Sequence, residues 1–125
     1  MKKFIIFSII VSIIFTITLT TKAQITKPKI TFIELGSDKC IPCKKMQPIM
    51  KSLEKKYGEQ LKVIFYDVWT KEHKDKSEKY GIKLIPTQIF QDENGKEIHR
   101  HEGYYPEKEI EKFLESKGLK VKGKS

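Results

Sequence analysis

The sequence predicts an α/β domain built on a mixed four-stranded sheet, with helices on both faces. Apolar patterning places the elements in the order β, α, β, α, β, β, α along the chain. The opening strand–helix–strand unit is expected to form a right-handed parallel pair. The last two strands flank a tight-turn sequence and are expected to form an antiparallel hairpin. A chain of 125 residues has room for one such domain.

The first half of this order begins with a buried strand and an amphipathic helix. Residues 30–35 (ITFIEL) are apolar enough for a strand that is covered on both faces. A helix is predicted over residues 40–57, because apolar side chains recur there at helical spacing between lysines. Pro42 falls in the first turn, where its missing N–H costs nothing, and Gly58 ends the helix.

Residues 61–68 are rich in Val, Ile, Phe and Tyr and predict the second strand. Residues 71–80 are mostly charged and predict an exposed helix that Gly81 stops.

A hairpin and a helix complete the predicted domain. Residues 87–91 and 96–102 predict the last two strands, and the sequence DENG at 92–95 predicts the turn between them. Residues 106–117 predict a final amphipathic helix. The tail from residue 118 is rich in Lys and Gly, and we expect it to be frayed.

Residues 1–23 have the layout of a secretory signal. Two lysines precede an apolar run over residues 4–19, and cleavage is predicted between Ala23 and Gln24. An uncleaved membrane anchor is the alternative, although the apolar run makes a helix of only about 24 Å against a hydrocarbon core of ~30 Å. Both interpretations place the domain of residues 24–125 outside the cytoplasm, so we expect an exported, periplasmic or otherwise extracytoplasmic protein.

The formal net charge of the whole chain is +9. Cleavage would remove three lysines and no acidic residue. Lysines are spread along the remaining chain instead of forming a basic stripe, which is typical of a solvated surface. We therefore expect no nucleic-acid partner.

The two cysteines lie in the sequence Cys40-Ile41-Pro42-Cys43. A bridge across two residues closes almost no loop and stabilises the fold little, so the pair indicates redox chemistry. Cys40 is expected at a helix N-terminus, where free N–H groups stabilise a thiolate, and would be the nucleophile. Cys43 is expected one turn inward as the resolving thiol. The uncharged Ile41 and Pro42, with no histidine between the cysteines, favour a reducing protein, and Lys39 partly offsets this.

Glu34 is a carboxylate in the middle of an apolar strand, where an unpaired charge is costly. Its position should place it beneath the helix start, near Cys43. Burial should raise its pKa into a range suited to proton exchange with the second thiol. The alternative is a glutamate that faces outward from a half-exposed strand.

Ile85-Pro86-Thr87 stands at the entry of the third strand. A cis bond before Pro86 would let the preceding backbone face the active site and pair with an extended substrate. The sequence leaves the alternative of a trans proline in an ordinary loop open.

His99 and His101 lie two apart on a predicted strand and should share one face. With the cysteines they could form a metal site, but no third ligand is nearby, and two exposed strand residues are the preferred interpretation. His73 is expected at the surface, and Trp69 is expected to have a packing role.

Taken together, these residues resemble the thioredoxin superfamily over roughly residues 30–114. The resemblance rests on motifs in a fixed order: the strand with Glu34, Cys40-Ile41-Pro42-Cys43-Lys44, Pro48, Tyr80-Gly81-Ile82, Ile85-Pro86-Thr87, Asn94-Gly95 and Gly103. The resemblance implies the thioredoxin fold, a cis-proline at Pro86, a buried acid at Glu34 and a groove glycine at Gly103.

Some positions depart from the family pattern. Lys39 replaces the usual Trp before the first cysteine, and Gly36 replaces an aromatic residue common earlier in that loop. Phe65 stands where thioredoxins often carry a lysine partner for the buried acid, and Ile-Pro replaces the usual Gly-Pro. With the export signal, the match is closer to extracytoplasmic thioredoxin-like proteins of bacteria.

The resemblance implies a monomeric thiol–disulfide oxidoreductase that reduces disulfides of exported proteins. A membrane thiol transporter is the implied electron donor, and no cofactor or metal is needed. The expected substrate groove consists of Ile41, Pro42, Ile85, Pro86, Gly103 and Tyr104. Two alternatives stay open: an extracytoplasmic dithiol oxidase or isomerase, and a metal-binding module that uses cysteine and histidine.

Overall fold

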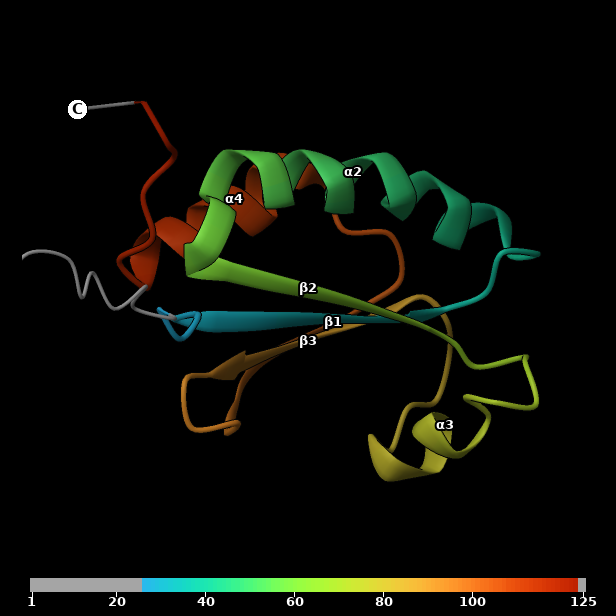
Figure 1. The fold of residues 1–125 in the computed structure, drawn as a ribbon. Coiled ribbons are helices and arrows are strands. Elements are labelled where there is room, and N and C mark those ends of the chain that lie inside the picture. The colour runs from blue at the N-terminus through green and yellow to red at the C-terminus, as the bar shows by residue number, and fades with distance from the viewer. Residues whose placement is uncertain (1–25, 124–125) are drawn as a thin grey trace, which may run out of the picture.

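The computed structural model describes residues 26–123. Four strands form one mixed sheet in the order β2-β1-β3-β4 (Figure 1). The central strand β1 (Ile30–Gly36) pairs parallel with β2 (Leu61–Asp67) and antiparallel with β3 (Thr87–Asp92). β4 (Glu97–Glu102) pairs antiparallel with β3. The predicted combination of a parallel unit and a hairpin is confirmed.

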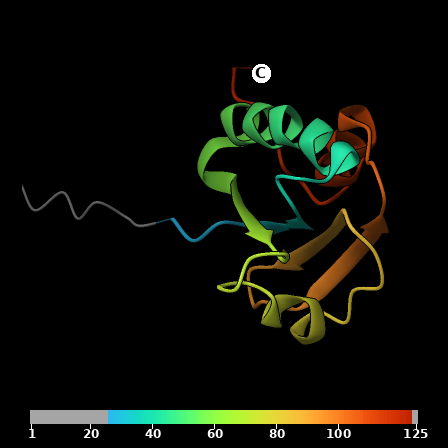
Figure 2. The same cartoon turned by 90° about the vertical axis from the view of Figure 1, so that its right-hand side faces the viewer.

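Helices lie on both faces of the sheet, as predicted. The long helix α2 (Ile41–Tyr57) and α4 (Glu107–Ser116) lie over one face, and the short helix α3 (Asp75–Lys79) lies on the other (Figures 1 and 2). A single 3₁₀ turn, η1 (Gly58–Gln60), joins α2 to β2.

Local sequence explains where α2 starts and stops. Cys40 is the N-cap, with extended backbone angles, and Pro42 lies in the first turn. Gly58 adopts a φ of 54°, a conformation that favours glycine, and its N–H donates to the Glu54 carbonyl.

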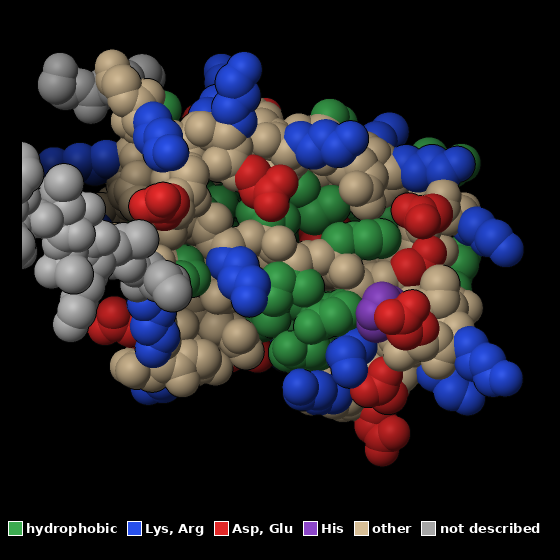
Figure 3. Space-filling view, viewed as in Figure 1, with side chains coloured by type: hydrophobic (Ala, Val, Ile, Leu, Met, Phe, Trp, Pro, Cys, Tyr) green, Lys and Arg blue, Asp and Glu red, His purple; other side chains and the backbone are tan. Residues whose placement is uncertain are grey.

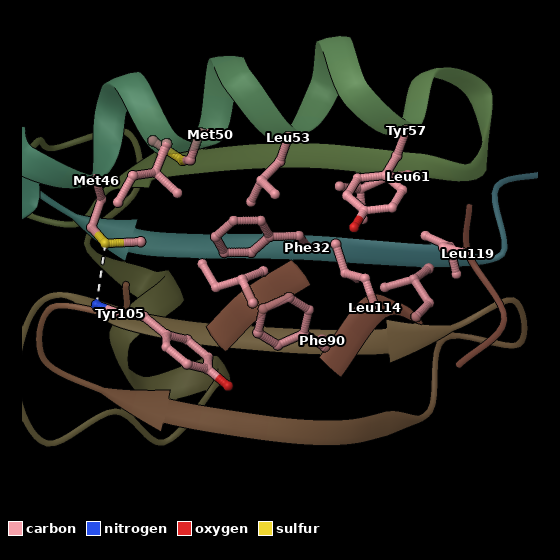
Figure 4. Packing of buried hydrophobic residues seen from close by; sticks show 13 residues of the cluster. Phe32, Met46, Met50, Leu53, Tyr57, Leu61, Phe90, Tyr105, Leu114 and Leu119 are labelled. Atoms are coloured by element: carbon pink, nitrogen blue, oxygen red, sulfur yellow. Dashed lines mark hydrogen bonds between the residues drawn. The ribbon is translucent and has the colours of Figure 1, made fainter. Parts of the chain in front are cut away.

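The larger core lies between the sheet and the pair α2 and α4. Side chains of α2 point onto Phe32 of β1 and Phe90 of β3, whose rings stack with centroids 4.8 Å apart (Figure 4). The Tyr105 N–H donates to Met46 Sδ at 3.4 Å and fastens the segment after β4 under α2 (Figure 4). A smaller cluster lies on the opposite face: Ile33, Leu35, Val68 and Ile89.

The polar helix is shorter than predicted. The sequence predicted residues 71–80, whereas α3 covers only Asp75–Lys79. The chain turns after β2 instead, because the Trp69 N–H and the Thr70 N–H both donate to Asp67. None of the residues of α3 is fully buried, so tertiary packing does not extend this helix beyond about one turn.

The prediction of a frayed tail is wrong for the described residues up to 123. Leu119 is only 2% exposed and belongs to the larger core. The Gln60 side chain donates to the Lys120 carbonyl (2.7 Å) and accepts from its N–H (3.0 Å). The Lys122 N–H donates to the Lys56 carbonyl at 2.8 Å. The buried Leu119 side chain and the paired backbone groups therefore hold the tail against the domain, although its composition is rich in Lys and Gly.

The predicted signal segment, residues 1–23, lies outside the described residues. Between residues 26 and 123, no helix combines the length and the apolar character that crossing a membrane requires.

Candidate active site

Cys40 and Cys43 form a disulfide at the N-terminus of α2, with their Cα atoms 5.2 Å apart. The Cys43 N–H donates to Cys40 Sγ at 3.4 Å, so the free end of the helix backbone faces this sulfur. Cys40 is 8% exposed and Cys43 is 0% exposed. The two cysteines therefore differ in exposure: Cys40 keeps a small accessible area, whereas Cys43 is fully buried.

Gly36 allows Cys43 to pack directly on the end of β1. A Cβ built on Gly36 would lie 3.2 Å from both Cβ and Sγ of Cys43, which is tighter than ordinary packing. The glycine at the aromatic position of related loops thus makes room for the inner cysteine. Glu34 lies two residues earlier on the same face of β1, about 7 Å away along the strand.

The Glu34 side chain is 0% exposed, so its predicted burial is confirmed. Oε1 accepts a hydrogen bond from Gln88 Nε2 at 3.2 Å, and Oε2 has no partner among the described residues. Desolvation by burial raises the pKa of this carboxyl to about 8, although the Gln88 hydrogen bond acts in the opposite direction. Its role in proton transfer stays a prediction.

Gln88 is a site residue that sequence reasoning missed. It lies opposite Glu34 in the β1–β3 pair and is fully buried. Its Nε2 also donates to the Gly103 carbonyl at 3.0 Å, so one amide joins the buried acid to the loop after β4. The available signal was the same as for Glu34, a polar residue inside the apolar strand sequence TQIF.

The Ile85–Pro86 peptide bond is cis, which resolves the alternative that the sequence left open. The Gly103 N–H donates to the Pro86 carbonyl at 2.7 Å, and Gly103 has a φ of 89°. Two of the predicted groove residues are thereby brought together. Among residues 26–123, neither the N–H nor the carbonyl of Ile85 takes part in a hydrogen bond.

Asp67 at the end of β2 connects two loops beside the cysteines. Its carboxylate accepts from the Asp38 N–H (3.0 Å), the Trp69 N–H (3.0 Å) and the Ser37 hydroxyl (3.4 Å). Burial opposes ionisation, but these hydrogen bonds together lower the Asp67 pKa. We call this set of contacts the Asp67 clamp.

Four large apolar side chains are exposed in the described part of the chain: Ile41, Trp69, Leu84 and Tyr104. All four lie in or beside the segments predicted to form the site. The expected packing role of Trp69 is wrong, because this side chain is 61% exposed. The Asp67 clamp holds the Trp69 backbone outside the core, after the last residue pair between β1 and β2.

His99 and His101 are only partly exposed, whereas the sequence suggested two exposed strand residues. His99 contacts the Tyr105 hydroxyl at 3.0 Å and stacks on Phe113, and His101 stacks on the Tyr105 ring at 3.9 Å. Aromatic packing on the α4 side of the sheet explains their partial burial. Within residues 26–123, no three His, Cys, Asp or Glu side chains gather into a set that could hold a metal ion.

Residues 18–118 match the family model described as a thioredoxin-like domain. Thioredoxin Y of Oryza sativa, a chloroplastic protein, is 34% identical over 77 residues, which cover 62% of this chain and 44% of that protein. A thioredoxin of Listeria monocytogenes is 26% identical over 98 residues, covering 78% of this chain and 92% of that protein. This chain therefore spans less than half of thioredoxin Y but nearly all of the bacterial relative.

A thioredoxin variant of Halobacterium salinarum is similar in fold, with a TM-score of 0.61 at 20% identity. The superposition covers 79% of this chain and 84% of that one. At this identity the likeness concerns the fold alone.

Proposed function

The chain belongs to the thioredoxin-like domain family, and on that premise we propose that it reduces disulfide bonds of exported proteins. Family membership and the Cys40–Cys43 pair support a thiol–disulfide oxidoreductase. The proposal adds three points to this: electrons flow to the substrate, the substrates are exported proteins, and the protein acts outside the cytoplasm.

The unequal exposure of the two cysteines carries the assignment of their roles in this proposal. In the reduced protein, the Cys40 thiolate attacks one sulfur of a substrate disulfide, and the other substrate sulfur leaves as a thiolate. Cys43 then attacks Cys40 Sγ, which releases the second substrate thiol and forms the Cys40–Cys43 disulfide. Two electrons pass to the substrate. Because Cys43 is buried against Gly36, an incoming disulfide meets Cys40 first.

Glu34 supports the second half of this cycle. A carboxyl with a pKa of about 8 is close to the ~8.5 of an ordinary thiol, so a proton can move between the two groups with little free-energy cost. We assign to Glu34 the acceptance of the Cys43 proton when the mixed disulfide is resolved.

The sequence between and before the cysteines supports the reducing direction and the location. Ile41 and Pro42 bring no charge next to Cys40, and the layout of residues 1–23 is that of an export signal. An exported reductase needs electrons from across the membrane. A membrane thiol transporter is therefore the proposed donor.

The redox potential tests the direction. Equilibration of the purified domain with reduced and oxidised glutathione should give a value near ~−270 mV, as for reducing thioredoxins, whereas a value near ~−120 mV would favour a dithiol oxidase. Cys40→Ser is the control that abolishes the redox signal.

Substrate capture tests the proposed partners. Cys43→Ser expressed with residues 1–23 should accumulate mixed disulfides with exported proteins, because the second attack is blocked. These adducts should release on reduction and be absent from Cys40→Ser. Capture of cytoplasmic proteins alone would contradict the proposed location.

A further inference from the structure

Two buried side-chain oxygens of the candidate active site have no hydrogen-bond partner within residues 26–123: Glu34 Oε2 and Gln88 Oε1. They belong to side chains that already touch, because Gln88 Nε2 donates to Glu34 Oε1 at 3.2 Å. Leaving a buried polar atom unpaired is costly, so an arrangement in which these two oxygens satisfy each other is favoured.

The strand register places the two end groups side by side. Glu34 of β1 and Gln88 of β3 are direct partners in an antiparallel pair, and such partners have Cβ atoms about 5 Å apart on one face of the sheet. Both side chains contain two methylene groups, so their end groups lie at the same height above the sheet. On the β2 side the partner of Glu34 is Phe65, whose side chain forms no conventional hydrogen bond. Gln88 is thus the polar neighbour of Glu34 in this row of the described sheet.

The orientation of the Gln88 amide follows from its two acceptors. Its Nε2 donates to Glu34 Oε1 and also to the Gly103 carbonyl at 3.0 Å. A backbone carbonyl can only accept, so the reversed amide would turn its oxygen against another acceptor. Gln88 Oε1 is therefore left as an acceptor that needs a donor. An ionised Glu34 offers no donor, whereas a protonated Glu34 carries one O–H.

We propose that Glu34 and Gln88 form a cyclic acid–amide pair, in which Glu34 Oε2–H donates to Gln88 Oε1 while Gln88 Nε2 donates to Glu34 Oε1. This pair makes Gln88 a positioning residue, because it links the proton of Glu34 to the backbone of Gly103. When Glu34 ionises, the O–H bond is lost and two acceptors face each other. The bond from Nε2 becomes charge-assisted and stronger. Both changes turn the amide toward the carboxylate and weaken its hydrogen bond to the Gly103 carbonyl.

The consequence for the reaction rests on the proposed function. The Gly103 N–H donates to the Pro86 carbonyl at 2.7 Å, so a closed pair holds Gly103 at both of its backbone groups. When the donor thiolate attacks Cys40 Sγ, the disulfide breaks and Cys43 leaves as a thiolate. Glu34 gives its proton to this thiolate and becomes a carboxylate. The Gly103 carbonyl is then released from the amide, and the groove backbone loosens in the reduced protein.

The neighbouring groups leave Glu34 to titrate by itself in the oxidised protein. Burial raises its pKa to about 8 and the Gln88 hydrogen bond opposes this shift, without a contribution from any charged group in the described part of the chain. The neighbouring titratable side chains are His101, paired with Gln88 on β4, and Cys43 of α2, which does not titrate while it is bonded to Cys40.

NMR of the oxidised, isotope-labelled protein tests the pair. The carboxyl carbon of Glu34 and the carbonyl carbon of Gly103 are followed upward in pH until Glu34 is ionised. We expect Glu34 to be protonated at the start and both signals to shift with one common midpoint, near about 8. A carboxyl that is already ionised well below this pH would overturn the pair. A Gly103 carbonyl that stays still while Glu34 titrates would overturn the link.

Three variants identify the groups responsible. Glu34→Gln replaces the acid O–H by an amide N–H and mimics the closed pair, so the Gly103 signal should keep its low-pH position at every pH. Gln88→Met has the same length without hydrogen bonds, so Glu34 should still titrate and Gly103 should not follow. His101→Asn removes the titratable side chain on β4 and should retain the common shift. A Gly103 shift that persists in Glu34→Gln would assign it to another group and overturn the link.

These spectra require no substrate and no electron donor. Loss of the common shift in a protein that still reduces disulfides would overturn the acid–amide pair and leave the proposed function intact. A common shift in a protein that captures no exported substrate would overturn the proposed function and leave the pair intact.

Discussion

At the scale of single residues, Glu34 has the most unusual environment in the described part of the chain. It combines complete burial, one hydrogen bond from Gln88 and one oxygen without a partner. Such a group is most stable in its neutral form, which is why its pKa rises to about 8. The carboxyl is thus held near the point where it can lose or gain a proton.

The variant Glu34→Gln should change how stability depends on pH. A carboxyl with a pKa of 4.5 in the unfolded chain and about 8 in the folded protein binds more protons when folded between these pH values. The wild-type free energy of unfolding should therefore fall as pH rises through this window, by at most about 1.4 kcal/mol per unit. Glu34→Gln should lack this fall.

Urea denaturation of the oxidised proteins from pH 5 to 9 measures this difference. Glu93→Gln, in the exposed hairpin turn, is the control and should follow the wild type. Parallel curves for the wild type and Glu34→Gln would show that the carboxyl is not buried in solution.

The variant Gln88→Leu tests the amide that joins Glu34 to Gly103. The substitution removes one hydrogen bond from the buried Glu34 carboxyl and one from the partly buried Gly103 carbonyl, and unfolding should become easier by about 1–3 kcal/mol. Because the Gln88 hydrogen bond lowers the Glu34 pKa, its loss should raise that pKa further. The upper end of the pH window should then move to higher pH.

Denaturation across pH separates these two effects. Gln91→Leu on the same strand changes neither hydrogen bond and should leave the window in place. A Gln88→Leu protein that is less stable but keeps the wild-type window would contradict the influence of the amide on Glu34.

Site residues that a local sequence pattern marks could be predicted. Contacts between residues far apart in the chain could not. Cys40 and Cys43 are defined by their spacing, and Glu34 by its apolar strand. The Gln88–Glu34 contact joins residues 54 apart, and the Asp67–Asp38 contact joins residues 29 apart. No local pattern specifies such pairs, because strand order and register decide which side chains meet.

At the scale of elements, packing decides the outcome more than composition does. The two helices on the α2 side have buried stripes and match their predicted ranges closely. α3 has no buried stripe and covers only Asp75–Lys79, half of the predicted residues 71–80. The tail after α4 gains a position in the core through Leu119, despite a sequence that suggested fraying.

The variant Leu119→Ala tests the docked tail. Removing a buried leucine side chain should lower the free energy of unfolding by about 2–5 kcal/mol. Lys120→Ala next to it should change the value by less than about 0.5 kcal/mol, because this side chain is exposed. Denaturant titration measures both. A loss below about 0.5 kcal/mol in Leu119→Ala would mean that the tail is undocked in solution.

At the scale of the whole molecule, the sheet has an open edge along β2. In the described part of the chain, this strand pairs only with β1. Four of its half-buried residues, Val63, Ile64, Phe65 and Tyr66, are large and apolar. Figure 3, viewed as in Figure 1 with β2 toward the reader, shows apolar side chains between lysines and acidic residues. Charged residues around such an edge discourage pairing with another copy.

The variant Lys62→Ile should weaken this protection. Lys62 is exposed on β2, and its replacement extends the apolar run of the edge. Aggregation, followed by light scattering, should begin at a several-fold lower protein concentration. Lys55→Ile on the exposed side of α2 is the matched control and should aggregate less readily than Lys62→Ile. Equal behaviour of the two variants would argue against the edge as the cause.

Both ends of the described chain lie far from the cysteines. The Lys29 N–H donates to the Gln60 carbonyl, and Gln60 also holds Lys120, whereas Cys43 packs on the other end of β1. The length of the strand, ~20 Å, separates the two ends of the sheet (Figure 1). A domain tethered to a surface at either end of this described part would therefore present Cys40 outward, which suits immobilisation on an electrode or a bead.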